Sequence, residues 1–393
     1  MKRRYWIGLI AFTCWCWLWF GSGMVVGHAA GAGSRERPRD DGSSAYLPVT
    51  GPCNPVFPRD HGPHPGYRNE WWYYTGNLQA ASGERFGFQL TFFRRQISPP
   101  GSTDGWPHPP SPWRTDQIYF AHAALSDLSS TGFHQREMVA RGAMNLAGSS
   151  QHQDTTAVFV RNWQLSIQGH DHHLMAATTD GFRIDLGLKE AKPPVPHGLA
   201  GYSRKGSTPE RASCYYSISR LTVSGTVFTG DREFPVQGIA WMDHEYGSAS
   251  LEPSLVGWDW FSLQLEDKSE LMIYLLRQQD GDNHPVSSGT YVDAGGQAHH
   301  LPAEAFSVEV LDYWVSPKSE ARYPHRWRVK VPRYGIDLVV TPALDNQEMI
   351  TTRSAGTTYW EGAVTVKTDG GFSGHAGVGY VELTGYAGPV WMD

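Results

Sequence analysis

Apolar residues recur at every second position along several stretches of this chain. The alternation runs through residues 86–92, 163–167, 182–188, 221–227 and 327–331. A period of two is typical of β-strands with one buried face. Turn-forming clusters such as Asp280-Gly281-Asp282-Asn283 separate these runs, and no long segment has a helical period. The pattern therefore predicts an all-β fold built from hairpins and meanders.

An internal repeat predicts how these strands are organised. Residues 71–78 with 88–94 resemble residues 258–265 with 271–277, and residues 238–243 resemble residues 377–382. Duplication of one β unit explains both matches. Closing each copy removes its sheet edges and leaves a lumen that apolar side chains line. We therefore expect two tandem antiparallel β-barrels, at residues 46–250 and 251–393, each suited to enclosing a long apolar molecule.

The N-terminus has the layout of a secretory signal. Lys2-Arg3-Arg4 leads into the apolar run from Tyr5 to Phe20, and Ala30-Gly31-Ala32 follows. We interpret residues 1–32 as a signal peptide and residues 33–45, which are polar and rich in glycine and serine, as a flexible leader. The expected location is exported, either periplasmic or secreted. The alternative is an uncleaved N-terminal membrane anchor, because the apolar run approaches the length of a membrane span.

Composition narrows the possible partners. Hydrophobic residues make up 40% of the chain and charged residues 18%, which suits a packed globule. Removing the first 32 residues takes the net charge from -6 to -9, and so acidic a chain is a poor partner for nucleic acid. Of the four cysteines, Cys53 and Cys214 lie outside the signal. They form either one disulfide or one buried and one free thiol, and the sequence leaves both possibilities open.

The first candidate motif lies in residues 69–78. Strand alternation puts Glu70, Trp72 and Tyr74 on one face, and Trp71 and Tyr73 on the other. Either the first set contacts a ligand, or it forms the floor of the barrel, where Glu70 is the polar partner of buried aromatic side chains.

A second candidate motif lies in residues 241–247. Trp241, Asp243 and Glu245 share a strand face, and His244 points the other way. Burial and a second nearby carboxylate would keep one of the two acids protonated near neutral pH. Asp259 faces either the first lumen or the interface between the barrels, and we favour the interface.

The sequence gives no support for a metal, a cofactor or a nucleophilic serine. Adjacent ligands in Asp243-His244-Glu245 lie on opposite strand faces and do not converge easily on one ion. The segment around Ser203 carries Lys205 where a serine-hydrolase elbow needs its second glycine. We therefore expect chemistry that uses neither a metal nor a cofactor.

Residues 52–388 resemble the AttH-like family of secreted lipocalin-like proteins, which includes the carotenoid 1,2-hydratases, also called hydroxyneurosporene synthases. The most specific matches lie in residues 69–78, 215–221, 241–247 and 379–386. The resemblance implies two lipocalin-like barrels and, in one branch, the addition of water to the terminal double bond of an acyclic carotenoid. It carries an essential aspartate onto Asp243, with aromatic partners at Trp241 and near Tyr216. This chain departs from the hydratases by having Trp241 where they usually have tyrosine.

These residues suggest an acid-catalysed hydration. In this hypothesis Asp243 donates the proton, Trp241 and Tyr216 stabilise the carbocation, and Glu245 or Glu70 orients the water. The substrate would be a carotenoid, another isoprenoid or a lipid, contacted by Glu70, Trp72, Tyr74, Glu245 and Asp259.

Two alternatives keep the lumen but change its use. One is a periplasmic carrier that binds a lipid or polyketide without chemistry and hands it to a membrane transporter. The other is a pocket whose shape promotes cyclisation or isomerisation of a polyene.

Overall fold

The computed structural model describes residues 46–102, 105–178, 181–368 and 376–390. The proposed signal peptide (1–32) and leader (33–45) lie outside the described residues. Within these ranges, no helix has both the length and the apolar character needed to cross a membrane.

Antiparallel strands make up most of the described chain, which confirms the all-β prediction. The described residues contain 23 strands, no α-helix and three short 3-10 helices, η1 (Arg59–His61), η2 (Ala303–Ala305) and η3 (Pro332–Tyr334). The strands are β1 (Asn69–Ala80), β2 (Arg85–Gln96), β3 (Gln117–Asp127), β4 (Gly132–Arg141), β5 (Ala147–His152), β6 (Thr155–Val160), β7 (Trp163–Gln168), β8 (Asp171–Ala177), β9 (Phe182–Glu190), β10 (Val195–Pro196), β11 (Tyr202–Arg204), β12 (Ala212–Thr229), β13 (Arg232–Gly247), β14 (Leu255–Leu265), β15 (Glu270–Gln278), β16 (Ser288–Val292), β17 (Ala298–Pro302), β18 (Ser307–Val315), β19 (Arg322–Val331), β20 (Ile336–Pro342), β21 (Glu348–Thr351), β22 (Thr357–Thr368) and β23 (Gly377–Leu383).

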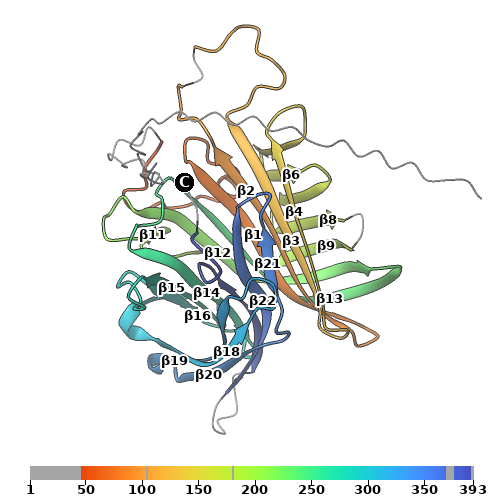
Figure 1. The fold of residues 1–393 in the computed structure, drawn as a ribbon, viewed down its shortest axis with the longest axis vertical. Coiled ribbons are helices and arrows are strands. Elements are labelled where there is room, and N and C mark those ends of the chain that lie inside the picture. Colours follow the sequence, from red (N-terminus) through yellow and green to blue (C-terminus); the bar gives the residue numbers. More distant parts are fainter. Residues whose placement is uncertain (1–45, 103–104, 179–180, 369–375, 391–393) are drawn as a thin grey trace, which may run out of the picture. The chain divides into compact units, whose positions relative to one another are not determined.

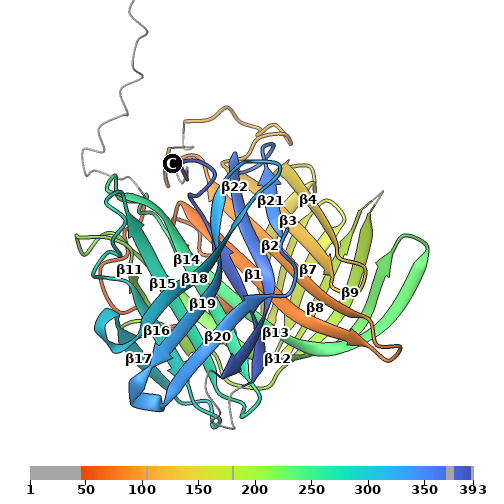
Figure 2. The ribbon, with the colours of Figure 1, turned by 60° about the horizontal axis from the view of Figure 1, so that its bottom comes forward.

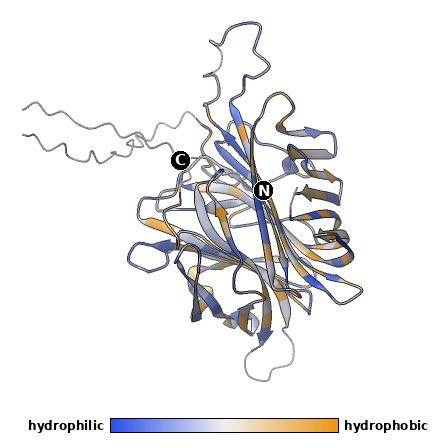
Figure 3. Cartoon of the chain, turned by 45° about the vertical axis from the view of Figure 1, so that its right-hand side comes forward, coloured by the Kyte–Doolittle hydropathy of each residue, from blue (hydrophilic) through white to orange (hydrophobic). Residues whose placement is uncertain are grey.

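The first sheet comprises β1 to β13 and is nearly closed into a barrel. Its order is β4-β3-β2-β1-β13-β12-β9-β8-β7-β6-β5, and the two ends approach each other where β3 and β4 contact β5 and β6 (Figure 1). Hydrophobic and polar residues alternate along its strands (Figure 3). This alternation is the period-two pattern of the sequence, with one set of side chains turned into the barrel.

The second sheet comprises β14 to β23 and forms a half-barrel. Its order is β17-β16-β15-β14-β23-β22-β20-β19-β18, with β21 paired to β22 (Figure 2). The central order β15-β14-β23-β22 repeats β2-β1-β13-β12 of the first sheet. The structure therefore confirms the duplication and the two barrel-like units, of which the second is only half closed.

A packed core occupies the part of the first barrel near the start of β1. Trp72, Phe88 and Trp163 are fully buried there, within one large hydrophobic cluster. The segment before β1 adds to it, because Phe57 packs against this cluster and the carbonyl of His61 accepts a hydrogen bond of 2.8 Å from Trp72 Nε1. The chain's own side chains thus fill this part of the barrel, and a cavity of about 1440 Å³ toward the other end is lined by residues that include Leu78, Phe86 and Val223.

A separate hydrophobic cluster joins the two sheets. Its buried members are Tyr73, Tyr215, Trp241, Leu255, Trp260, Met272, Tyr274, Leu276, Ala363 and Tyr380. Close approach depends on Gly87 of β2, where an added Cβ would lie 2.6 Å from the Tyr380 hydroxyl. Gln264 of the second sheet also donates hydrogen bonds to the carbonyl groups of Ser219 and Ala240. Both faces of β1 and β13 are therefore covered, one by the barrel core and one by the second sheet.

Candidate active site

A cleft of about 220 Å³ lies between the two sheets. Strands β1, β12 and β13 provide one wall, and β14, β22 and β23 provide the other. Its lining combines aromatic rings with buried acids, which is typical of ligand sites that fix a mostly apolar molecule by a few polar groups. Its lining includes Tyr73, Lys205, Tyr215, Asp243, Glu245, Trp260, Glu361 and Glu382.

Strand register explains which side chains reach the cleft. Tyr73 of β1 lies opposite Asp243 of β13, which in turn lies opposite Ser217 of β12. Directly opposed residues share a sheet face, so these three side chains point the same way. Glu245 lies two residues along on β13 and shares that face, as the sequence predicted.

Asp243 is buried and receives three hydrogen bonds. Its Oδ2 accepts 2.7 Å from the Tyr215 hydroxyl, and its Oδ1 accepts 2.6 Å from Trp241 Nε1 and a further bond from the Ser217 hydroxyl. Burial raises the pKa of Asp243 to about 7, although the three donors oppose this by stabilising the carboxylate. Near neutral pH this group therefore exchanges a proton readily.

A buried histidine is linked to Asp243 through the hydroxyl of Ser217. His197 Nε2 lies 2.6 Å from the Ser217 hydroxyl, and its Nδ1 lies 2.8 Å from the hydroxyl of Thr290 on β16. Burial lowers the pKa of His197 to about 3, so the ring is neutral. The ring thus connects Thr290 of the second sheet to Ser217 of the first by hydrogen bonds. No sequence motif indicated this contact.

Glu245 is paired with the one lysine of the described cleft lining. Its Oε1 lies 3.0 Å from Lys205 Nζ and 2.5 Å from the Ser213 hydroxyl. Lys205 Nζ also lies 4.1 Å from the centre of the Tyr274 ring. Glu245 therefore has an ion-pair partner in Lys205 and a hydrogen-bond partner in Ser213 at the side of the cleft.

The second sheet contributes two further acids that we did not predict. Glu361 of β22 and Glu382 of β23 lie directly opposite each other. Burial, together with the charge of Glu382, raises the pKa of Glu361 well above its usual range, and burial raises the pKa of Glu382 to about 8. The internal repeat could have identified Glu382, because it aligns this residue with Asp243.

Tyr216 does not flank Asp243, which corrects the predicted site. It lies opposite His244 in the register and shares the barrel-facing side, where its hydroxyl lies 3.0 Å from His244 Nδ1. Its neighbour Tyr215 occupies the expected position. Trp241 does contact Asp243, but it does so through its indole N–H and is not among the residues that line the cleft.

The first motif also belongs mainly to the barrel interior. Trp72 and Tyr74 lie in its core, and the Tyr74 hydroxyl lies 2.7 Å from His172 Nδ1. Glu70 borders the cleft, yet its carboxylate is bound inside by Arg94, at 2.7 Å. Hydrogen bonds from His244 and His64 and the charge of Arg94 outweigh burial and lower the pKa of Glu70.

Asp259 lies neither in the first lumen nor across the interface between the sheets. It accepts hydrogen bonds from Arg277 Nε at 2.9 Å and from the Tyr386 hydroxyl at 3.0 Å, both from the second half of the chain. Its neighbour Trp260 faces the cleft, so alternation turns Asp259 toward the concave face of the half-barrel.

His64, Glu70 and His244 form a potential metal-binding group among the described residues. Their ligand atoms lie within 4.8 Å of one another. Glu70 Oε1 already lies 2.7 Å from His64 Nδ1 and 2.9 Å from His244 Nε2, and Glu70 Oε2 is bound by Arg94. These contacts satisfy the carboxylate without an ion, and the arginine would repel one. The cluster therefore fits a buried ion-pair network better than a metal centre.

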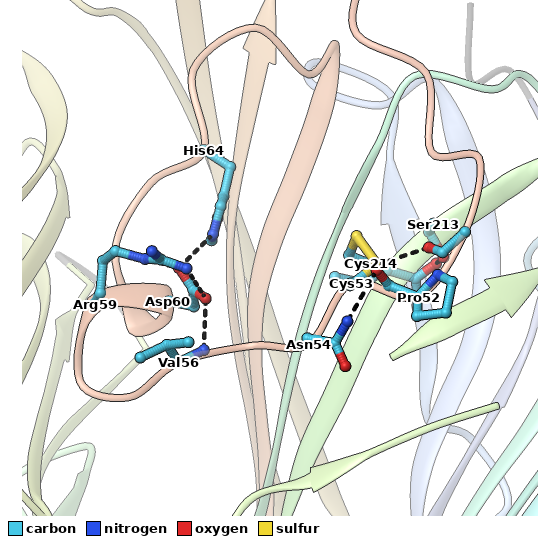
Figure 4. Close-up of a disulfide and its surroundings, with 11 residues drawn as sticks. Pro52, Cys53, Asn54, Val56, Arg59, Asp60, His64, Ser213 and Cys214 are labelled. Carbon is cyan, nitrogen blue, oxygen red and sulfur yellow. Dashed lines mark hydrogen bonds and ion pairs between the residues drawn. A yellow bond between two sulfur atoms is a disulfide. The ribbon is translucent and has the colours of Figure 1, made fainter. Parts of the chain in front are cut away.

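A disulfide anchors the segment that precedes β1 and packs against the core of the first barrel. Cys53, which precedes β1, is bonded to Cys214 of β12, with their Cα atoms 5.8 Å apart (Figure 4). The same segment carries Asp60, which accepts a hydrogen bond of 2.7 Å from the backbone N–H of Val56. Cys214 immediately precedes Tyr215, so the bond also fixes the strand that positions the donor to Asp243.

The fold and the cleft define a lipocalin-like protein of two antiparallel sheets with buried carboxyl groups between them. The chain belongs to the AttH-like family, whose pattern matches residues 48–386. Its fold matches the crystal structure of an AttH-type protein (NE1406) from Nitrosomonas europaea, with a TM-score of 0.75, 34% identity, and coverage of 86% of this chain and 99% of that one.

Two more distant relatives are named for reactions with water. Kievitone hydratase from Nectria haematococca matches with a TM-score of 0.65 at 14% identity, over 87% of this chain and 96% of that one, and so shares the fold. Dehydratase asqC of Emericella nidulans is 23% identical over 209 residues, or 51% of this chain. The match spans 57% of that dehydratase, little more than half its length.

Proposed function

We propose that this protein is a hydro-lyase that adds water to, or removes water from, a carbon–carbon double bond of an apolar ligand in the cleft. The observation that carries the proposal is Asp243, a buried carboxyl group on the cleft whose pKa is raised to about 7 by burial. Protonating an isolated alkene needs an acid held neutral in a dry site. The names of the hydratase and dehydratase relatives support the same reaction class.

In the hydration direction, Asp243 gives its proton to one alkene carbon. Positive charge then develops on the other carbon, and the rings of Tyr73, Tyr215 and Trp260 on the cleft wall are suited to stabilising it. Water adds to that carbon and loses a proton. Trp241 and Ser217 position Asp243 by hydrogen bonds and touch no ligand in this scheme. The protein's own carboxyl groups supply the proton transfers.

The substrate we propose is a long polyene or other isoprenoid of the carotenoid type, as in the hydratase branch of the family. The aromatic walls support an extended unsaturated chain, because ring faces pack well against conjugated carbon. The main rival is a carrier that binds the same ligand in the cleft and leaves it unchanged.

Mass spectrometry of the organic extract from protein purified out of its native host tests this proposal. We expect a ligand and its form differing by one water with the wild type, and only the unreacted form with Asp243→Asn. Asp259→Asn is the matched control, since it removes a buried aspartate outside the cleft. The same unmodified ligand in all three proteins would refute the enzyme and support the carrier.

We also propose that the protein is exported. A disulfide between Cys53 and Cys214 is typical of oxidising compartments. Sequencing the N-terminus of the mature protein checks this: a start near residue 33 supports a cleaved signal, whereas an intact N-terminus in the membrane fraction supports an anchor.

A further inference from the structure

The segment between β2 and β3 is long and mostly exposed. Its described residues, 97–102 and 105–116, form no strand or helix and project beyond the end of the first barrel (Figure 1). The backbone N–H of Ile97 donates a hydrogen bond of 2.8 Å to the carbonyl of Asp116, so the two ends of the segment meet. These residues belong neither to the cleft lining nor to the barrel core. Loops of this length without secondary structure are uncommon in compact domains and usually have a function.

Large apolar side chains on this segment and at its base face the solvent. Ile97 is 47% exposed and Trp113 is 53% exposed. Leu47, which is 49% exposed, and Pro100 both border Gly66, where an added Cβ would lie 2.7 Å from Leu47 Cδ1 and 3.9 Å from Pro100 Cγ. Exposed apolar side chains that gather on one surface mark a site of interaction.

The tryptophans of this segment lie beside arginines. The Arg114 guanidinium lies 4.7 Å from the centre of the Trp106 ring, and Arg141 donates a hydrogen bond of 3.1 Å to the carbonyl of Trp113. Tryptophan prefers the headgroup level of a bilayer, where its ring is apolar and its N–H remains wet. Arginine can lie along apolar groups and keep its charge in water. This combination therefore favours the boundary between lipid and water.

The backbone of the segment has few hydrogen-bond donors. Six of its residues are prolines, which have no backbone N–H: Pro99, Pro100, Pro107, Pro109, Pro110 and Pro112. A backbone N–H that enters lipid without an acceptor costs free energy. The prolines thus lower the cost of placing an irregular loop at a membrane boundary. A protein partner would not require this, because its own carbonyl groups can accept hydrogen bonds.

The same end of the barrel adjoins the cleft and the start of the described chain. Arg95, which lines the cleft, lies on β2 just before the segment. The Tyr46 hydroxyl donates a hydrogen bond of 3.1 Å to the carbonyl of Gln96. In the sequence, residues 21–45 separate Tyr46 from the apolar run at residues 5–20. If that run enters a membrane, during export or as an anchor, this end of the barrel is the nearest to the lipid along the chain.

We propose that the surface formed by Leu47, Ile97, Trp106 and Trp113 docks on a lipid bilayer. Ile97 and Trp113 enter the headgroup region, and Arg114 stays at its aqueous side. The inference goes beyond the proposed function and does not depend on it, because docking requires no substrate. For a hydro-lyase, its consequence is that a ligand dissolved in the bilayer lies close to the cleft.

Flotation with lipid vesicles tests the docking surface. The mature protein from the native host is mixed with vesicles of phosphatidylcholine and a minor share of phosphatidylglycerol. We expect the wild type to float with the vesicles, and Ile97→Ser with Trp113→Ser to lower the partition coefficient by at least about tenfold. Tyr313→Ser with Val315→Ser is the matched control, since these side chains are similarly exposed on β18 of the second sheet. Substitutions at exposed positions should leave the fold intact, which urea denaturation checks.

A wild type that leaves the vesicles unbound would overturn the proposal. So would an equal fall in the control pair, or, in a mature protein that starts near residue 33, unchanged flotation of the Ile97→Ser, Trp113→Ser variant. A wild-type dimer that dissociates on the same two substitutions would assign the surface to a second copy of the chain instead.

Fluorescence quenching decides the case in which an N-terminal anchor holds every variant on the vesicles. Lipids brominated near the headgroup quench tryptophans that reach them. Trp113→Phe should lose part of the quenching seen with the wild type, because Trp113 itself enters the lipid. Equal quenching of the two proteins would show that Trp113 stays in water and that the docking surface is wrong.

Discussion

The hydroxyl of Tyr215 donates a hydrogen bond of 2.7 Å to Asp243 and accepts one of 3.0 Å from the indole of Trp260. Tyr215 and Asp243 belong to the first sheet, whereas Trp260 belongs to the second. The second half of the chain thus orients the acid of the first half. This linkage makes the properties of Asp243 sensitive to changes in either sheet.

Replacing Tyr215 by phenylalanine should raise the pKa of Asp243 above about 7. The lost hydrogen bond stabilises the carboxylate, so its removal favours the protonated form. The free energy of unfolding should fall by about 1–2 kcal/mol, because Asp243 and Trp260 each lose a partner. Titration of ¹³C-labelled aspartate carboxyl groups by NMR measures the pKa. An unchanged or lower value would contradict this account, and Tyr334→Phe serves as the control.

Hydration by the wild type should slow as the pH rises above about 7. Asp243 must be protonated to act as an acid, and its pKa is raised by burial to about 7. Above that pH the rate should fall by about tenfold per unit. The measurement is the initial rate of water addition to the ligand identified in the extract, between pH 5 and 9. A rate that is flat across this range would exclude Asp243 as the proton donor.

Tyr73→Phe should leave the unliganded protein at least as stable as the wild type. The Tyr73 hydroxyl is buried and makes no well-formed hydrogen bond, so removing it relieves a desolvation penalty of roughly 1 kcal/mol and loses only a weak contact with the Glu361 carboxyl group. Urea denaturation compares it with Tyr215→Phe, whose hydroxyl is satisfied. A loss of stability as large as that of Tyr215→Phe would show that Tyr73 has a partner in solution.

Stability should fall between pH 6.5 and 8.5, and Glu382→Gln should reduce the slope. The folded-state pKa values of Glu382 (about 8) and Asp243 (about 7) are raised, mainly by burial, whereas unfolded carboxyl groups titrate near pH 4. The folded state therefore holds more protons in this window, so its stability is lost as the pH rises through these values. Asp243, Glu245, Glu361 and Lys205 share the cleft with Glu382.

The histidines also titrate, so they affect the pH range of the measurement and the comparison between wild type and Glu382→Gln. The pKa values of His61, His122 and His197 are lowered by burial to about 3, so their contribution to stability rises until unfolded histidine has lost its proton, about one unit above its ordinary pKa, and is the same in wild type and variant. His64, whose pKa is raised through Asp60 and Glu70 despite burial, contributes equally to wild type and variant. Urea denaturation at three pH values gives the slopes, and equal slopes would count against a raised pKa at Glu382.

Removing the disulfide by Cys53→Ser with Cys214→Ser should lower the free energy of unfolding by about 2–5 kcal/mol. The bond closes a loop between residues 161 positions apart, and long loops gain most from such a constraint. Denaturation of the double variant, compared with the reduced wild type, tests this. A loss confined to the variant and absent on reduction would point to packing of the serines instead.

The sequence predicted the strands and the repeat, but not which strand face turns toward the cleft. Alternation correctly grouped Trp241, Asp243 and Glu245. It did not separate the roles of Tyr215 and Tyr216, because both faces of β12 are buried and both carry tyrosines. One face of β12 packs on the barrel core and the other packs on the second sheet. Hydrophobicity therefore does not show which of the two faces points out of the barrel.

The missed acids have a similar cause. Glu361 and Glu382 are remote in sequence from Asp243, and only packing of one sheet on the other brings them to the same cleft. His197 lies just after the two-residue strand β10, and its contact with Ser217 depends on how that short segment folds back. Period and propensity carry no information on such contacts.

The two-sheet repeat has a consequence for how this site arose. Asp243 and Glu382 occupy equivalent positions in the two copies and line the same cleft. Duplication of one β unit therefore placed two copies of one position on the lining of a single cleft. The two copies differ in their surroundings, because Asp243 accepts three hydrogen bonds whereas Glu382 lies opposite Glu361.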